Sequence, residues 1–276
     1  MVGASGRQRA NKGVIDNVQV MAPALPQQKQ IADVLSAYDD LIENNTRRIR
    51  ILEQMAQAIY REWFVYHRFP GHEKVKMVDS KTKFGKIPEG WKTEKVKDFV
   101  DFVRGFEPGS KNYQEQPGEG LILFLRVGDL GDRQSNIFIE KELVGDRVLN
   151  KDDIVISMDG SVGIVRMELE GAYSSGIRKI IIKSEALNKP FVWQLLLSED
   201  IQNTIKEHAR GTTILHAGES INQMEFVLPT DRIMKEFFDK EEIIMKLLSD
   251  LTDQNQNLHQ ARDLFLPKLV TGEIKI

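Results

Sequence analysis

The stretch LPQQKQIADVLSAYDDLIENNTRRIRILEQMAQAIYREWF, residues 25–64, carries apolar residues at alternating spacings of three and four. This pattern, held for about five heptads, is typical of a long helix that packs an apolar seam against a partner helix. Pro26 suits the first turn of a helix, where its missing N–H group costs nothing. Because a helix of this length exceeds what one domain core can cover, the sequence predicts a partner helix.

A second periodic segment follows Pro229 and ends near Leu269, so we expect it to be the partner. Each helix follows a short strand-like run, GVIDNVQVMAPALP at 13–26 and ESINQMEFVLP at 219–229, which indicates an imperfect internal repeat. A chance likeness between two amphipathic helices is the alternative. The expected interface residues are Ile31, Leu35, Tyr38, Ile42, Asn45, Ile49, Leu52, Ile59, Leu248, Leu251, Asn255, Leu258 and Phe265.

Two asparagines, Asn45 and Asn255, occupy seam positions that are otherwise apolar. An Asn in such a seam fixes the register by meeting a polar group on the opposite helix, at some cost in stability. The alternative is that each Asn lies on a partly exposed flank.

The region between the helices has mixed signals. Short strand-like runs occur at 121–127, 137–139, 153–158, 163–167, 178–182 and 223–228, and a helical segment spans 189–209. The sequence therefore predicts an α+β domain with a mixed or antiparallel sheet and one packed helix, flanked by the two long helices.

Composition excludes several classes of protein. The 276 residues are 41% hydrophobic and 29% charged, without an apolar run of the ~20 residues that a membrane span needs. The N-terminus lacks the apolar region of a secretory signal, so we expect a cytoplasmic protein. The chain has no cysteine, its five histidines show no metal-ligand spacing, and we expect no metal site. A net charge of −3 requires any nucleic-acid contact to come from a local patch or beside a basic partner.

Several loops place Gly beside Arg or a hydroxyl residue, most clearly SMDGSVG at 157–163. Taken alone, its Asp-Gly pair indicates a hairpin turn. A phosphate-binding GxxxxGK[ST] loop is absent from the sequence. A hydrolase that uses Asp152, Asp153 and Asp159 is conceivable, but no His, Lys or metal ligand lies near them in the sequence.

Five segments in order resemble the specificity subunit of type I restriction-modification systems. They are the quoted stretch at 25–64, IPEGWKTEKVKDF, DIVISMDGSVG, RGTTILHAGESINQMEFVLP and RDLFLPKLVTGEI. The resemblance implies two recognition domains, each reading half of a split DNA site, held apart by two helices that pair as an antiparallel coiled coil. It divides this chain into a remnant of a first recognition domain (1–24), a spacer helix (25–70), a complete recognition domain (71–229) and a second helix with its tail (230–276).

The resemblance also implies a non-catalytic chain. It implies that S-adenosylmethionine, ATP and Mg²⁺ belong to partner subunits and that this chain binds no cofactor. The absence of the methyltransferase motifs NPPF and DPPY is consistent with this expectation. The expected partners are double-stranded DNA, modification (methyltransferase) subunits docked on the helices, and restriction subunits joined through the complex. A shortened chain of this kind is expected to form a homodimer; pairing with another shortened subunit, or a fragment left by gene truncation, are the alternatives.

DNA reading would combine phosphate contacts, which position the protein, with base-edge contacts, which specify the sequence. The expected DNA-binding residues lie in or beside the Gly-containing loops: Arg104, Lys111, Tyr113, Arg126, Ser157, Asp159, Ser161, Arg178, Arg210, Thr212, Thr213 and His216. Each could instead be a solvated surface residue or a turn-former. Two other functions remain open, a coiled-coil scaffold with a globular head and a stand-alone nuclease that uses the Asp-rich turns.

Overall fold

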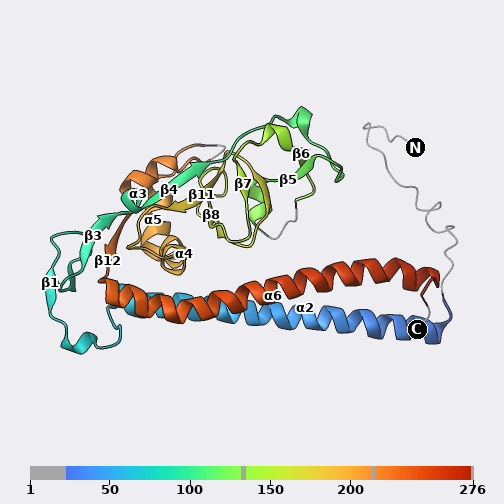
Figure 1. Ribbon diagram of the computed structural model, residues 1–276, viewed down its shortest axis with the longest axis horizontal. Coiled ribbons are helices and arrows are strands. Elements are labelled where there is room, and N and C mark those ends of the chain that lie inside the picture. The colour runs from blue at the N-terminus through green and yellow to red at the C-terminus, as the bar shows by residue number, and fades with distance from the viewer. Residues whose placement is uncertain (1–22, 132–134, 213–214, 275–276) are drawn as a thin grey trace. The chain divides into compact units, whose positions relative to one another are not determined.

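The computed structural model describes residues 23–131, 135–212 and 215–274. The expected remnant of a first recognition domain, residues 1–24, therefore lies almost wholly outside the described residues. The chain divides into two compact units, residues 1–49 with 251–276 and residues 50–250. The long helices α2 (Leu25–Tyr60) and α6 (Asp231–Thr271) contribute to both units (Figure 1).

In the first unit the two helices run antiparallel. The ring of Tyr38 packs on that of Phe265, with centroids 6.3 Å apart, while Nδ2 of Asn45 lies 3.5 Å from Oε1 of Gln254. As the residue number rises along α2 it falls along α6, which defines the antiparallel direction. Ile31, Asn45, Leu251 and Leu269 are buried here, as heptad packing requires.

In the second unit, α2 ends in a π-helical turn, Arg61–Val65. The turn is closed by the bond from Tyr66 N to Arg61 O, and its wider path buries the consecutive residues Trp63 and Phe64. Both rings contact the ring of Phe237 on α6, with centroids 5.8 and 4.8 Å away. This aromatic packing holds the end of α2 against the start of α6.

The same aromatic cluster anchors the globular part of the second unit. Phe191, on helix α4 (Lys189–Leu197), packs against Phe64 and Phe237. Asn188 caps α4 by accepting a bond from the backbone N–H of Phe191. Helix α5 (Glu199–His208) follows directly, so the predicted single helical segment is two helices broken at Ser198.

Two antiparallel strand pairs form the base of the globular part. Strand β1 (Met77–Asp79) pairs with β2 (Lys86–Pro88), and β3 (Lys92–Lys95) pairs with β12 (Glu225–Leu228). The short helix α3 (Val96–Phe99) continues from β3. The strand that precedes α6, β12, is therefore paired with β3, which lies near the start of the domain sequence.

Two four-stranded sheets form the rest of the described domain (Figure 1). The first has the order β6-β5-β10-β7, with β5 and β10 parallel, and the second has the order β4-β11-β8-β9 and is antiparallel. Their bounds are β4 Val100–Arg104, β5 Leu121–Leu125, β6 Phe138–Glu140, β7 Val148–Leu149, β8 Val155–Ser157, β9 Val165–Arg166, β10 Gly171–Tyr173 and β11 Ile177–Ile182. Short 3₁₀ helices lie at η2 His72–Lys74, η3 Ser110–Asn112, η4 Val127–Leu130, η5 Lys141–Leu143 and η6 Gly218–Gln223.

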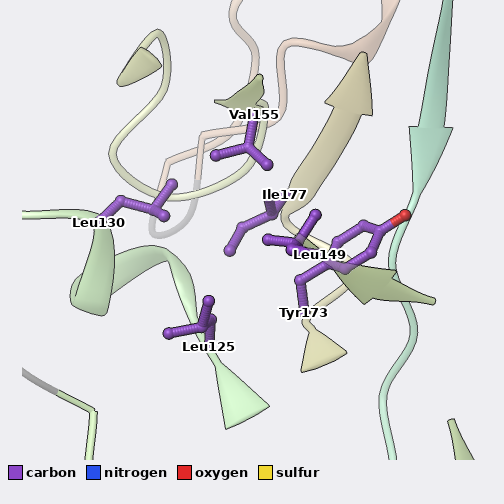
Figure 2. Packing of buried hydrophobic residues seen from close by; sticks show 6 residues of the cluster. All are labelled: Leu125, Leu130, Leu149, Val155, Tyr173 and Ile177. Atoms are coloured by element: carbon purple, nitrogen blue, oxygen red, sulfur yellow. The ribbon is translucent and has the colours of Figure 1, made fainter. Parts of the chain in front are cut away.

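A hydrophobic cluster joins strands of both sheets. Its buried members are Leu125, Leu130, Leu149, Val155, Tyr173 and Ile177, and Figure 2 shows their side chains converging. Burial of these apolar side chains holds the ends of β5, β8, β10 and β11 together. The predicted fold class, an α+β domain with mixed and antiparallel strands between two long helices, is confirmed. In the described residues, no helix is long and apolar enough to span a membrane.

Candidate nucleic-acid interface

Hydrogen bonds join four segments that adjoin the two large sheets. They are residues 104–107 after β4, 157–163 after β8, 174–176 between β10 and β11, and 210–217, of which 213 and 214 lie outside the described residues. We call these segments the loop cluster. Each adjoins a strand or helix that contributes buried residues to the core, such as Val100 in β4, Val155 in β8, Ala172 in β10 and Ile205 in α5, so packed elements carry the cluster.

Backbone hydrogen bonds interlock the loop cluster. Both Met158 N and Asp159 N donate to Gly176 O, and Gly160 N donates to Leu215 O. Arg210 and His216 exchange a pair of N–H···O bonds of 3.0 and 2.7 Å. The loops therefore support one another and do not stand free in solvent.

Two glycines allow the loops to approach this closely. A Cβ atom on Gly105 would lie 2.3 Å from the carbonyl oxygens of both Tyr173 and Ser174. On Gly176, a Cβ atom would lie 2.6 Å from the side chain of Val127. At Gly105 the clash is with the backbone, which cannot move aside as a flexible side chain can, so the close contact requires glycine.

Ser175 is the centre of a polar network. Glu107 Oε1 accepts hydrogen bonds from Ser175 N (3.1 Å) and Ser175 Oγ (2.7 Å). The carbonyl oxygen of Ser175 accepts from Nε of Arg104 at 3.2 Å and from Nη1 of Arg178. Glu107 therefore fixes the turn whose carbonyl group holds two arginines.

Asp159 continues this network. Its Oδ1 lies 2.7 Å from Nδ1 of His216, and its Oδ2 lies 3.9 Å from Nη2 of Arg178. The Asp159 side chain is only 16% exposed, whereas the His216 side chain is 63% exposed. A mostly covered carboxylate thus orients an imidazole that faces solvent.

Arg178 is itself buried, with 8% of its surface exposed. Desolvation lowers the pKa of its guanidinium, and the nearby Asp159 carboxylate opposes that shift. Its contacts are to Ser175, Ile177 and Asp159. The structure therefore places Arg178 behind the exposed face, as a support for the loops.

Ser157 is fully buried, and its hydroxyl serves the loop that contains it. Oγ donates to the carbonyl oxygen of Ser161 and accepts from Ile164 N at 2.8 Å. This pair of bonds closes the turn between β8 and β9. Ser157 and the backbone of Ser161 hold the loop in shape, while the remainder of Ser161 is exposed.

The other expected DNA-binding residues lie in the loop cluster or elsewhere in the same domain. Arg126 is half-exposed, and its Nε lies 3.4 Å from Asp129 Oδ2. Arg210 is exposed and donates to the carbonyl oxygens of Glu207 and Ala209. Lys111 and Thr212 are exposed, and Thr213 lies outside the described residues.

Tyr113 occupies a different setting from the other candidates. Its ring packs against that of Phe124, with centroids 5.7 Å apart. Desolvation raises the pKa of its hydroxyl, and the negative charge of Glu107 acts in the same direction. At neutral pH the hydroxyl therefore stays protonated and able to donate a hydrogen bond.

The arrangement presents cationic and hydrogen-bonding side chains on interlocked loops. Exposed Arg side chains can pair with phosphate oxygens or guanine edges, and an imidazole can bind a base edge. Sequence reasoning missed Glu107 and Ser175, because their contacts join positions 68 residues apart. The described residues contain no group of three or more His, Asp or Glu side chains arranged to hold a metal ion.

In the helix pair, the printed contacts between the two helices involve five of the expected interface residues, Tyr38, Ile42, Asn45, Asn255 and Phe265. Asn255 Nδ2 lies 3.2 Å from Thr46 Oγ1 and 3.4 Å from Ile42 O, so both seam asparagines face polar groups across the pair. Ile31, Asn45, Leu248 and Leu251 are buried. The others are partly buried: Leu35, Tyr38, Ile42, Ile49, Leu52, Ile59, Asn255, Leu258 and Phe265.

Sequence reasoning also missed a buried carboxylate on α6. Glu241 is completely buried, and neither of its carboxyl oxygens has a hydrogen-bond partner. Desolvation raises its pKa from 4.5 to about 7. The signal in the sequence was the heptad spacing from Phe237 to Ile244, which skips a seam position occupied by this Glu.

The chain matches the family model for the type I restriction modification DNA specificity domain over residues 1–54 and 88–264. It is 25% identical to the type I restriction enzyme MjaVIII specificity subunit of Methanocaldococcus jannaschii, over 99% of this chain and 66% of that protein. It is 26% identical to the MjaIX specificity subunit of the same organism, over 99% of this chain and 65% of that protein. The chain thus spans just under two thirds of the length of these curated relatives.

A solved structure shares the fold. The crystal structure of the S subunit of a type I restriction-modification system from M. genitalium matches with a TM-score of 0.57 and 17% sequence identity, over 89% of this chain and 61% of that chain. At this identity the likeness concerns the fold alone.

Proposed function

Because this chain belongs to the type I restriction-modification DNA specificity family, we propose that its globular domain reads one half of a split DNA site. In this proposal the chain is the non-catalytic recognition subunit of a type I restriction-modification complex. Its curated relatives are named as specificity subunits, which supports this role.

The loop cluster is the observation that carries the proposal. Arg104, Arg210 and His216 are exposed, yet each is held by hydrogen bonds to neighbouring loop atoms. Sequence-specific reading requires side chains that are held in position before DNA arrives, because ordering them on binding would cost free energy. A solvated surface without function would not require such interlocking.

The expected DNA-binding residues divide between contact and support. We assign phosphate and base contacts to the exposed residues, namely Arg104, Lys111, Arg126, Arg210, Thr212 and His216. Ser157, Asp159 and Arg178 act from behind, because their side chains are covered and bonded within the loops. Ser161 contributes its carbonyl group to the same support.

The net charge of −3 is low for a chain that binds DNA alone. Affinity for duplex DNA depends largely on neutralising phosphates with Lys and Arg. We therefore propose that modification subunits supply much of the positive charge around the site. In the assembled complex this chain would contribute specificity, and its partners would contribute most of the non-specific affinity.

An exposed apolar flank on the helix pair of the second unit offers a docking surface for those subunits. Ile51 and Met55 on α2, and Ile243 and Leu247 on α6, are 41–64% exposed. Each residue stands one position before a seam residue. In an antiparallel pair these positions share one flank, so the four side chains form a stripe suited to further helices.

Catalysis belongs to the partners in this proposal. Modification subunits would transfer the methyl group from S-adenosylmethionine, and restriction subunits, joined through the complex, would use ATP and Mg²⁺. A split site has two halves, whereas the described residues hold one globular domain, so we propose a second copy of this chain as the source of the other reading domain.

The proposal is tested by co-expressing the chain with type I modification subunits and incubating the purified complex with a random pool of duplex DNA. Sequencing the retained DNA should show enrichment of one split motif. Retained DNA with the composition of the input pool would contradict the proposal, and a complex that never forms would contradict the docking role. Met55→Asp should abolish co-purification, whereas Gln57→Asp, at an exposed position two residues further on and therefore on a different side of α2, should not.

A further inference from the structure

The pairing of Asp159 with His216 determines which nitrogen of the imidazole carries its proton. Asp159 Oδ1 lies 2.7 Å from His216 Nδ1, and Arg178 Nη2 lies 3.9 Å from the second carboxylate oxygen. An ionised carboxylate only accepts hydrogen bonds, so Nδ1 must be the protonated nitrogen. In a neutral imidazole this leaves Nε2 as an unprotonated acceptor.

The backbone around His216 gives that acceptor a fixed position. His216 N and O both bond to Arg210, and Ala217 N donates to Met158 O. The ring is held at its Nδ1 side by Asp159, while the side chain remains 63% exposed. The free Nε2 is therefore the atom of the ring available to a ligand.

We propose that His216 is a specificity-determining residue that reads the exocyclic amino group of a base, and that Asp159 is the positioning residue that makes this possible. In the major groove, adenine N6 and cytosine N4 offer donors, whereas guanine offers only acceptors. An Nε2 acceptor can bind the amino group of adenine or cytosine. The major-groove edge of guanine offers it no donor, so guanine is not bound in this way. The inference rests on the proposed function and adds the chemical class of base that one residue reads.

Removal of the carboxylate would change this preference. An Asn at position 159 can donate its amide N–H to Nδ1, which moves the imidazole proton to Nε2 and turns the acceptor into a donor. The same exchange of Asp for Asn beside a histidine is known to produce the wrong tautomer in serine proteases. The Asp159→Asn variant should therefore lose the preference for an amino group although the imidazole of His216 is still present.

The test uses the complex of this chain with its modification subunits. Once the motif is known, affinity is measured for duplexes in which one adenine is replaced by purine, or one cytosine by 2-pyrimidinone, so that only the amino group is lost. At one position of the half-site, the unaltered complex should bind the analogue duplex about three- to tenfold more weakly than the duplex with the natural base. Asp159→Asn and His216→Ala should reduce that ratio to about one at the same position.

Further measurements separate positioning from folding. Binding to an unrelated duplex, and its dependence on salt, should be unchanged in both variants, because no phosphate contact is removed. Asp152→Asn, an exposed carboxylate change elsewhere in the domain, should keep the full discrimination. If His216→Ala retains every single-position preference, or if its lost preference is for guanine, the inference is wrong. A complex that methylates no specific motif would overturn the proposed function itself, and this inference with it.

Discussion

Asn45 on α2 meets Gln254 on α6 across the helix pair, with Nδ2 and Oε1 3.5 Å apart, at a position where 7% of the Asn45 surface is exposed. A buried amide with a single long hydrogen bond stabilises an interface less than an apolar residue would. What it provides is a preference for one register, since sliding either helix would leave the amide without its partner.

Asn45→Leu should therefore stabilise the chain by about 1 kcal/mol in the free energy of unfolding while loosening the register. Chemical denaturation measures the first effect, and disulfide trapping between pairs of introduced cysteines at alternative registers measures the second. Asn44→Leu, on the exposed neighbouring position, should change stability by less than about 0.5 kcal/mol. A destabilised Asn45→Leu variant would show that the amide contributes more than register.

Glu241 should make stability depend on pH. Its folded pKa of about 7 lies above its ordinary value of 4.5, so the ionised form opposes folding. Stability is then full below about pH 4.5 and falls as the pH rises through 7. Glu241→Leu should raise the free energy of unfolding by roughly 2–3 kcal/mol at about pH 8 and remove most of the pH dependence.

Urea unfolding at about pH 5 and about pH 8 measures both effects. The matched control is Glu242→Leu, which changes the adjacent and exposed carboxylate and should leave the pH dependence in place. If the free energy of unfolding of Glu241→Leu depends on pH as much as that of the unaltered chain, other titratable groups cause the pH dependence.

Gly105→Ala should disrupt the loop cluster by steric overlap alone. The new Cβ atom would lie 2.3 Å from two backbone carbonyl oxygens, so strands β4 and β10 would have to separate locally. We expect a loss of about 1–3 kcal/mol in stability together with weaker specific DNA binding. Gly128→Ala adds the same methyl group where nothing lies within 4 Å, and should be tolerated. Equal behaviour of the two variants would contradict the close packing described above.

Arg210→Ala and Arg178→Ala should both weaken DNA binding, but by different routes. Arg210 is exposed, so its loss should lower affinity and reduce the salt dependence without changing the melting temperature. Arg178 is buried and bonded to Ser175 and Ile177, so its loss should lower the melting temperature as well. Thermal unfolding and DNA titrations at several salt concentrations separate these results, and an unchanged melting temperature for Arg178→Ala would argue that it contacts DNA directly.

The long helices were predictable because a heptad pattern is a local signal, carried by residues only three or four positions apart. Leu251 and Asn45 fall where that pattern places them. The π-helical turn at Arg61–Val65 was not predictable, because it results from burying both Trp63 and Phe64 against Phe237, a residue far along the chain.

The loop cluster was predictable in location but not in the roles of its residues. Gly, Arg and hydroxyl residues marked stretches at or after the ends of β4, β5, β8 and α5. Burial of Ser157 and Arg178, and the bond from Ser175 to Glu107, depend on how β8, β10 and β11 are arranged in space. Sequence patterns describe neighbours along the chain, whereas these contacts join residues brought together only by the sheets.

The central claim, that this chain selects the bases at which a methyltransferase acts, is tested most directly by single-molecule sequencing of methylated DNA from cells with and without it. We expect a split methylated motif that disappears when the chain is removed, returns with the unaltered chain and is palindromic if two copies act together. An identical set of methylated sites in both kinds of cell would contradict the account.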